Sequence, residues 1–180
     1  MQNNRLRDIF LKKKIDKNYI IRKAVPQDAK GIINCMQSVM NEKIYLVSEY
    51  YLLTERGEHE RLKNPGDLTL VCESNGDIAG VLTIQRGMYK KNRHIANLGI
   101  AIKKDYRNKK IGTNMIMEAL IWSKDQGILK VNLEVFSINV NAIKTYRKLG
   151  FEYEGVRKNQ FIIEGKYVDD ILMTFFTDTL

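Results

Sequence analysis

The chain has 180 residues, of which 44% are hydrophobic and 28% are charged. This length and composition are typical of one globular domain with a sizeable core, and no apolar run reaches the length of a membrane span. Lysine and arginine number 30 against 21 acidic residues, which gives a net charge of +9. The excess favours an anionic partner: nucleic acid, a membrane surface or a phosphorylated small molecule. Because the N-terminus also lacks a signal-peptide core, we expect a cytoplasmic protein without a membrane partner.

The cysteines and histidines do not form a recognisable motif. Cys35 and Cys72 lie in apolar surroundings without a C-x-x-C pair, and His59 and His94 are isolated. We therefore expect two buried thiols in a reducing compartment and no metal site.

The first third of the chain contains one clear helix and one irregular segment. Residues 1–18 are polar and basic and are predicted to form an arm, while residues 19–180 form a single domain. A short strand is expected at Tyr19–Arg22, and Pro26 is typical of the first turn of a helix. Residues 41–64 mix aromatic and acidic side chains, with a short helix near residues 56–63. This irregular segment is the best candidate for a specificity-determining surface.

A β-hairpin follows. Two β-rich runs, Leu68–Glu73 and Ile78–Ile84, flank the turn Ser74-Asn75-Gly76-Asp77. Asn-Gly between two such runs is a strong hairpin signal.

The centre of the chain reads as strand, turn, helix and strand. Residues Ala96–Ile102 form the first strand, a basic turn covers residues 103–111, and an apolar helix runs from Gly112 to a stop at Gly127. The strand Val131–Phe136 comes next, so the unit predicts a right-handed crossover between parallel strands. Free N–H groups and the helix dipole at the start of this helix make the turn a site for phosphate.

One further helix and two long strands complete the predicted fold. The helix covers Asn139–Leu149, and the strands cover Glu152–Ile163 and Tyr167–Phe176. The elements together predict an α/β (α+β) domain with a mixed sheet.

Several motifs resemble those of the GNAT superfamily of N-acetyltransferases. The turn Arg107-Asn108-Lys109-Lys110-Ile111-Gly112-Thr113 is similar to the family's pyrophosphate loop, Gln/Arg-x-x-Gly-x-Gly/Ala. Asn139-Val140-Asn141-Ala142 with Tyr146 and Gly150-Phe151 resembles Asn-x-x-Ala…Tyr-x-x-x-Gly-Phe. Arg22 with Pro26-Gln27-Asp28-Ala29 resembles the opening strand and helix, and Gly165-Lys166-Tyr167 with Asp169 and Met173 resembles the closing hairpin. The resemblance covers nearly the whole chain.

The resemblance implies a sheet of about seven strands with a splayed fourth and fifth strand, flanked by about four helices. It implies acetyl-CoA as the co-substrate, with no metal. Its binding residues are then Ile100, Ala101, Ile102, Arg107, Asn108, Lys109, Lys110, Ile111, Gly112, Thr113 and Asn139. Asn108 and Lys110 stand where many members have glycine, so Lys110 must either adopt a permissible backbone angle or leave the loop wider.

Two residues are candidates for the chemistry of acetyl transfer. Tyr146 lies at the position of the family's general acid. A phenol suits this role because it stays protonated at neutral pH and can donate to a departing thiolate. The alternative is a tyrosine that only packs against the sheet. Glu134 is the candidate base, at a position where some members, including ribosomal-protein alanine N-acetyltransferases, have a catalytic glutamate. Its alternative is a solvent-exposed or ion-paired side chain. The resemblance implies that Asn139 hydrogen-bonds the pantetheine arm of acetyl-CoA. The alternative role is a helix N-cap, and Asn139 can serve both.

The resemblance therefore predicts direct acetyl transfer to a primary amine, either a small molecule or a protein N-terminus, in a ternary complex. A cluster of Glu42, Glu49, Glu55 and Glu58 with three tyrosines could line an entrance for a cationic amine, and the alternative is a solvated surface. The rival function is a non-catalytic module that binds an acyl-CoA or uses its basic surface for nucleic acid. Scattered basic residues without interleaved aromatics argue against nucleic acid. A homodimer is left open.

Overall fold

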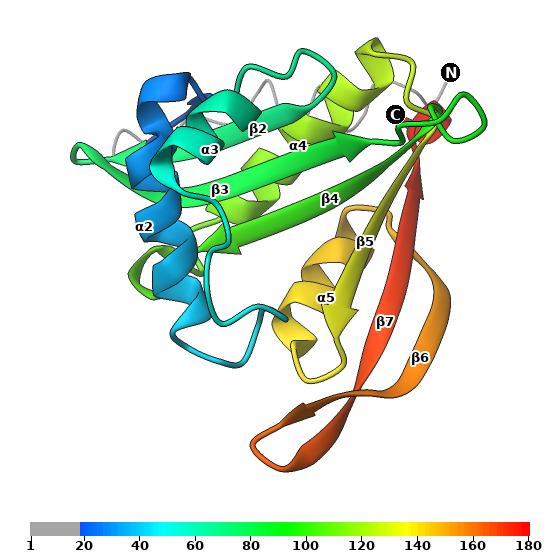
Figure 1. Cartoon of the computed structure of the whole chain (residues 1–180). Helices are drawn as coiled ribbons and strands as arrows, with labels where there is room; N and C mark the ends of the chain where they lie inside the picture. Colours follow the sequence, from blue (N-terminus) through cyan, green and yellow to red (C-terminus); the bar gives the residue numbers. More distant parts are fainter. Residues whose placement is uncertain (1–18) are drawn as a thin grey trace.

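A computed structural model describes residues 19–180 and shows one seven-stranded sheet (Figure 1). The strand order is β1-β2-β3-β4-β5-β7-β6, with β4 and β5 parallel and every other neighbouring pair antiparallel. The predicted arm, residues 1–18, lies outside the described residues. The strands are β1 (Ile20–Lys23), β2 (Leu68–Ser74), β3 (Asp77–Arg86), β4 (Ile95–Ile102), β5 (Lys130–Phe136), β6 (Glu152–Ile163) and β7 (Lys166–Phe176). The predicted mixed sheet is confirmed.

Four α-helices and three short 3₁₀ helices accompany the sheet in the described part of the chain. The α-helices are α2 (Ala29–Met40), α3 (Glu55–Arg61), α4 (Ile111–Asp125) and α5 (Val140–Lys148). The 3₁₀ helices are η1 (Pro26–Asp28), η2 (Lys104–Tyr106) and η3 (Thr177–Thr179). Each predicted helix is present within a few residues of its expected bounds. Of the 3₁₀ turns, η2 falls within the predicted basic turn, and η3 was not expected from the pattern.

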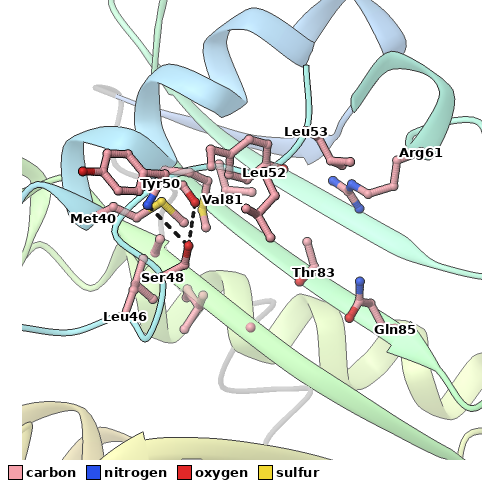
Figure 2. Close-up of a pocket in the computed structure, with 15 residues that line it drawn as sticks. Met40, Leu46, Ser48, Tyr50, Leu52, Leu53, Arg61, Val81, Thr83 and Gln85 are labelled. Carbon is pink, nitrogen blue, oxygen red and sulfur yellow. Dashed lines mark hydrogen bonds between the residues drawn. The ribbon is translucent and has the colours of Figure 1, made fainter. Parts of the chain in front are cut away.

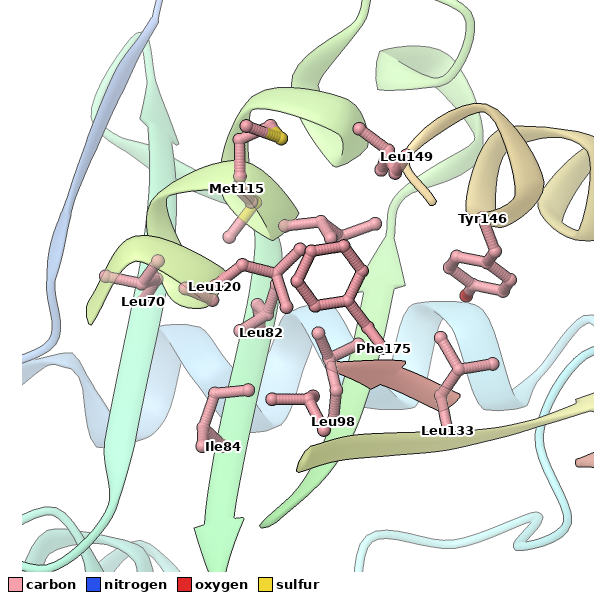
Figure 3. Close-up of a cluster of buried hydrophobic side chains, with 14 of the residues drawn as sticks. Leu70, Leu82, Ile84, Leu98, Met115, Leu120, Leu133, Tyr146, Leu149 and Phe175 are labelled. Carbon is pink, nitrogen blue, oxygen red and sulfur yellow. The ribbon is translucent and has the colours of Figure 1, made fainter. Parts of the chain in front are cut away.

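The larger core lies on the face of the sheet that α4 and α5 cover. Apolar residues of β2 to β5 and β7 point to this face and pack against both helices. Figure 3 shows Leu82, Leu98 and Phe175 of the strands together with Leu120 of α4. None of the α4 residues from Ile111 to Ser123 is classed as exposed. The helix is apolar on most of its circumference because it packs against the sheet and the C-terminal turn η3.

A smaller core lies on the opposite face, beneath α2. Ile32 and Cys35 of α2 pack against Val71, Ile78 and Val81 of the sheet. Cys72 belongs to the larger core instead. Both cysteines are therefore buried, and both are free thiols, as predicted. Burial raises the pKa of Cys35 to about 12 and that of Cys72 to about 11, which keeps both thiols protonated.

An ion-pair network fixes the first strand. Nη1 and Nη2 of Arg22 donate to the two carboxylate oxygens of Asp28 at 2.7 and 2.8 Å, and Nε donates to Glu73 at 3.0 Å. The hydrogen bonds from Arg22 lower the pKa of Asp28 against the opposing effect of burial. The network joins β1 to η1 and β2, and therefore holds the start of α2 against the sheet.

A membrane span or a cluster of metal ligands would point to other functions. None of the described helices is both long and apolar enough to cross a membrane. Within residues 19–180, no group of three or more histidine, cysteine or acidic side chains is arranged to hold a metal ion.

Candidate active site

The site begins where β4 and β5 separate. Their parallel pairing runs only from Ile95 and Lys130 to Asn97 and Asn132. Beyond these residues β4 stays paired with β3, and β5 stays paired with β7. The two strands therefore diverge at their carboxyl ends and leave a gap in the sheet (Figure 1). The predicted splay is confirmed.

The backbone of β4 presents two residues to this gap. The N–H of Lys103 donates to the carbonyl of Ala79 at 2.9 Å, so the alternation of an antiparallel ladder directs the backbone groups of Ala101 to β3 as well. The N–H and C=O groups of Ile100 and Ile102 point the other way, where β5 no longer pairs with them. Of the three predicted β4 residues, Ile100 thus offers its N–H and C=O in the gap, and Ile102 offers its N–H, because the Ile102 carbonyl accepts from Nε of Arg107. Ala101 offers neither group.

The basic loop ends at the same gap. Asn108 has a φ of 61° and Lys110 a φ of 62°, so both residues adopt the left-handed conformation that favours glycine. The loop therefore keeps a glycine-like path without its glycines, and the first of the two alternatives for Lys110 holds. Asn tolerates this conformation, whereas Lys adopts it at a cost of about 1–2 kcal/mol.

Helix α4 begins directly after Lys110. The first bond across its N-terminal turn runs from the N–H of Asn114 to the carbonyl of Lys110, at 3.0 Å. The N–H groups of Ile111, Gly112 and Thr113 precede this bond and have no partner in the helix. A Cβ on Gly112 would meet Ile100 Cδ1 at 3.7 Å, an ordinary contact, so packing within the protein does not require glycine here. The open space, free N–H groups and positive charge suit a pyrophosphate.

Arg107 does not direct its guanidinium to this helix. Its Nη1 donates to Glu42 Oε2 at 2.7 Å, Nη2 donates to the other oxygen of Glu42, and Nε donates to the carbonyl of Ile102 at 2.9 Å. The guanidinium also lies 4.8 Å from the ring centroid of Tyr45. Arg107 therefore connects the phosphate-loop candidate to the segment that follows α2, a contact that the sequence pattern did not indicate.

Helix α5 positions Asn139 and Tyr146. Asn139 caps the helix, because its Oδ1 accepts from the N–H of Ala142 at 3.3 Å. Tyr146 is 8% exposed and its ring lies 5.8 Å from that of Phe151, so this side chain packs within the core. Figure 3 shows the ring on the side of the core near Leu133 of β5. Burial raises the pKa of Tyr146 to about 12, which leaves the phenol protonated at neutral pH.

Glu134 lies on the opposite face of β5, in an ion-paired group. Its Oε1 is 3.0 Å from Nη1 of Arg157, and the same nitrogen donates to Oδ2 of Asp170 at 2.7 Å. The Glu134 side chain is 58% exposed, whereas Asp170 is buried. Burial first, and the Glu134 carboxylate second, raise the pKa of Asp170 against the effect of Arg157. The sequence pattern missed Asp170; its signal was the Asp169-Asp170 pair directly before the apolar run Ile171-Leu172-Met173.

A pocket of about 320 Å³ opens on the face that α2 covers. Its roof and rim are the apolar side chains of Met36, Met40, Leu46, Leu52 and Leu53. Its floor comes from alternate residues of β3 and β4, namely Val81, Thr83, Gln85, Gly99 and Ala101 (Figure 2). Ile100 also lines it, so this α2-face pocket adjoins the β4 backbone that faces the gap.

Three of the four glutamates that could line an entrance for an amine pair with other side chains of the protein. Glu58 is fully buried and accepts from Arg61 Nε and the Tyr51 hydroxyl, both at 2.8 Å. Glu42 pairs with Arg107, as described above, and Glu49 lies 3.8 Å from Lys43. The solvated-surface alternative thus fits Glu49, while Glu42 and Glu58 hold the irregular segment in place.

The comparisons with known proteins agree with this geometry. A family model described as the acetyltransferase (GNAT) family matches residues 35–151. The L-amino acid N-acetyltransferase AaaT of Escherichia coli (strain K12) is 30% identical over 166 residues, which cover 86% of this chain and 95% of that protein. The spermidine N(1)-acetyltransferase of the same organism is 29% identical over 118 residues, 65% of this chain and 62% of that protein. A GNAT-family acetyltransferase structure from Streptococcus pneumoniae has a TM-score of 0.83 and 32% identity, covering 88% of this chain and 99% of that one.

The fold and its divided sheet define an acyltransferase. The chain belongs to the GNAT family of acetyltransferases, and the resemblance drawn from its motifs is confirmed.

Proposed function

We propose that this protein transfers the acetyl group of acetyl-CoA directly to a primary amine within a ternary complex. One observation carries the proposal: the β4–β5 gap exposes backbone groups of Ile100 and Ile102 and leads to the free N-terminus of α4. An extended pantetheine arm needs such a strand edge, and a pyrophosphate needs such a helix end.

Each part of the gap then has a binding role. Residues Asn108 to Thr113 hold the pyrophosphate through backbone N–H groups and the charges of Lys109 and Lys110. Ile100 and Ile102 bind the pantetheine arm, and an N–H of the same strand edge stabilises the thioester oxygen as negative charge develops on it. Asn139 can contribute its side-chain N–H₂, because only Oδ1 is used by the helix cap. Arg107 keeps the loop in place rather than binding phosphate through its side chain.

The amine must lose a proton before it attacks. Glu134 is exposed and ion-paired with Arg157, and it accepts this proton directly or through a water molecule. A new C–N bond forms at the acetyl carbon, the C–S bond breaks, and the sulfur leaves with the electron pair. The acetyl group therefore passes to the amine without a covalent enzyme intermediate, and the buried, protonated cysteines have no role in it.

Tyr146 stabilises the leaving sulfur. Its pKa of about 12 lies above the ordinary thiol value of about 8.5, so the phenol holds its proton more strongly than the departing thiolate attracts it. Donation of a hydrogen bond to the departing thiolate, which takes its proton from solvent as the product leaves, is the role that this pKa favours.

Acetyl-CoA titration followed by thermal unfolding tests the cofactor site. At a hundred times the dissociation constant, acetyl-CoA is expected to stabilise the protein by about 2.7 kcal/mol. Coenzyme A should stabilise it as well, because the shared nucleotide and pantetheine make most of the proposed contacts, whereas ATP lacks the pantetheine arm. Release of free thiol on addition of an amine then tests the transfer.

No shift with acetyl-CoA would contradict the proposal. A shift without thiol release for any primary amine would favour the non-catalytic acyl-CoA-binding module.

A further inference from the structure

The α2-face pocket has an apolar character that bears on the acceptor. Among the described residues that line it, Arg61 carries the only charge, and no carboxylate is present. Met40, Leu52 and Leu53 face the floor residue Val81 across the cavity (Figure 2). A volume of about 320 Å³ corresponds to roughly ten water molecules, enough for one large apolar side chain.

The ionic groups near the pocket are already paired with one another and add no free charge to its apolar lining. Nε and Nη2 of Arg61 donate to the two oxygens of Glu58, and Nη1 donates to Thr69 at 3.1 Å, so the guanidinium is already paired. Glu42 is likewise held by Arg107. A polyamine entering the pocket would bring a second cation towards Arg61 and find no free carboxylate, and an unpaired charge is costly to bury.

The rim of the pocket exposes apolar surface. Leu52 is 88% exposed and Tyr50 is 71% exposed, although both line the cavity. The segment is nonetheless fixed at its base, because Gln37 Nε2 donates to the carbonyl of Glu49 at 3.1 Å and Ser48 donates to the carbonyl of Tyr50 at 2.6 Å. An ordered rim with uncovered apolar side chains is typical of a surface that a ligand covers.

The pocket also has the right position relative to the β4 strand. Gly99, Ile100 and Ala101 line it, and Ile100 presents its backbone to the β4–β5 gap. A side chain placed in the pocket therefore lies next to the strand edge at which the proposed thioester is held. An amine one carbon away from that side chain can reach this edge, whereas an amine at the end of a long chain need not occupy the pocket.

We propose, on the basis of the proposed function, that the acceptor is a primary amine whose adjacent carbon carries an apolar side chain of about the size of leucine or phenylalanine. A free amino acid and the first residue of a peptide share this chemistry. The 41–53 segment thus selects the acceptor by apolar burial, and Glu42 within it serves the structure through its pair with Arg107.

A panel of amines tests this specificity with the full chain and saturating acetyl-CoA. The panel contains L-leucine, L-phenylalanine, glycine and spermidine, with leucinamide and Leu-Gly-Gly to separate a free amino acid from a peptide N-terminus. We expect kcat/KM for the leucine or phenylalanine compounds to exceed that for glycine and spermidine by about tenfold or more. Equal or faster acetylation of spermidine or glycine would overturn the inference while leaving the acetyltransferase function intact. Failure of every amine, with no acetyl-CoA shift in melting, would instead refute the proposed function.

Two matched variants locate the effect. Leu52→Ala removes an exposed rim side chain without disturbing the core, and should lower kcat/KM for the leucine compounds about fivefold to tenfold while leaving glycine unchanged. Val47→Ala is the control, because Val47 is also exposed, lies in the same segment and does not line the pocket. The inference fails if Leu52→Ala lowers the rate for every amine equally, or if Val47→Ala has the same effect.

Discussion

The two faces of the sheet are built differently. Beneath α4 and α5 the strands contribute to one continuous core, and the candidate cofactor residues lie at its edge. Beneath α2 the core is small, and the 41–53 segment covers an open pocket with side chains that remain exposed. The proposed function makes use of this division, because the closed face would position the thioester rigidly while the open face leaves room for an acceptor. Changes on the two faces should therefore have different effects.

The largest effect is expected at Tyr146, on the closed face. Tyr146→Phe should lower kcat by about a hundredfold, because the sulfur loses its hydrogen-bond donor, while acetyl-CoA binding and stability change little. Steady-state kinetics and thermal unfolding measure both quantities. Tyr153→Phe is the control, since Tyr153 is exposed on β6. A Tyr146→Phe enzyme with the full transfer rate across the pH range would remove Tyr146 from this role.

The connection between the two faces comes next. Glu42→Ala breaks the bidentate pair with Arg107 and should lower the free energy of unfolding by about 2 kcal/mol, since the partner loses charge-assisted hydrogen bonds. The KM values for both substrates should rise together, because the pair joins the phosphate-loop candidate to the pocket segment. Urea unfolding and kinetics provide the measurements.

A double-mutant cycle and a control separate this connection from general damage. Arg107→Ala in the Glu42→Ala background should cost less than in the wild type, as expected for contacting residues. Glu49→Gln should change stability by no more than about 0.5 kcal/mol, because Glu49 and Lys43 form an exposed pair at 3.8 Å. Additive effects of Glu42→Ala and Arg107→Ala would contradict the proposed connection.

A smaller effect of opposite sign is expected in the phosphate loop. Lys110→Gly should stabilise the protein by about 1 kcal/mol or less, because glycine adopts a φ of 62° without strain but has greater freedom in the unfolded chain. Lys109→Gly is the matched control, as Lys109 is not among the residues with positive φ. It should destabilise the protein slightly, and both variants should weaken acetyl-CoA binding through lost charge. Equal stability changes in the two variants would show that Lys110 is not strained.

The smallest expected effect is a difference in pH dependence between two aspartates. Burial raises the pKa of folded Asp170 above 3.8, so its contribution to stability is greatest below pH 3.8 and is lost as the pH rises through the raised value. Hydrogen bonds from Arg22 lower the pKa of folded Asp28, so its contribution is present above pH 3.8 and is lost as the pH falls through the lowered value.

Unfolding free energies measured from pH 3 to pH 7 test these signs. As the pH rises from 3 to 7, the unfolding free energy of Asp170→Asn should increase relative to that of the wild type. The unfolding free energy of Asp28→Asn should decrease relative to that of the wild type over the same range. The pH-dependent change in unfolding free energy for Asp170→Asn should be smaller than the stability change caused by Lys110→Gly. The same pH trend in both variants would show that one of the two assignments is wrong.

Much of the fold follows from local patterns. The hairpin at Asn75-Gly76, the apolar helix before Gly127 and the closing strand Glu152–Ile163 lie where the sequence predicts them. The β4–β5 gap was predicted as well. That prediction came from the resemblance of the loop, Asn139 and Tyr146 to the motifs of a known family. The sequence of the loop left its backbone conformation open. The structure shows that Lys110 adopts a left-handed φ.

The acceptor side was not predictable in the same way. Glu42 and Arg107 are 65 residues apart, and Arg157 of β6 reaches Glu134 of β5 across β7. An acidic residue has the same appearance in a sequence whether it binds a cationic substrate or an internal arginine. By itself the sequence determined the helices, the strands and the basic turn before α4, because periodicity, turn residues and helix starts act over a few neighbouring positions. Only the tertiary structure decided which charges are paired and that the pocket is apolar, since both depend on which distant side chains the folded sheet brings together.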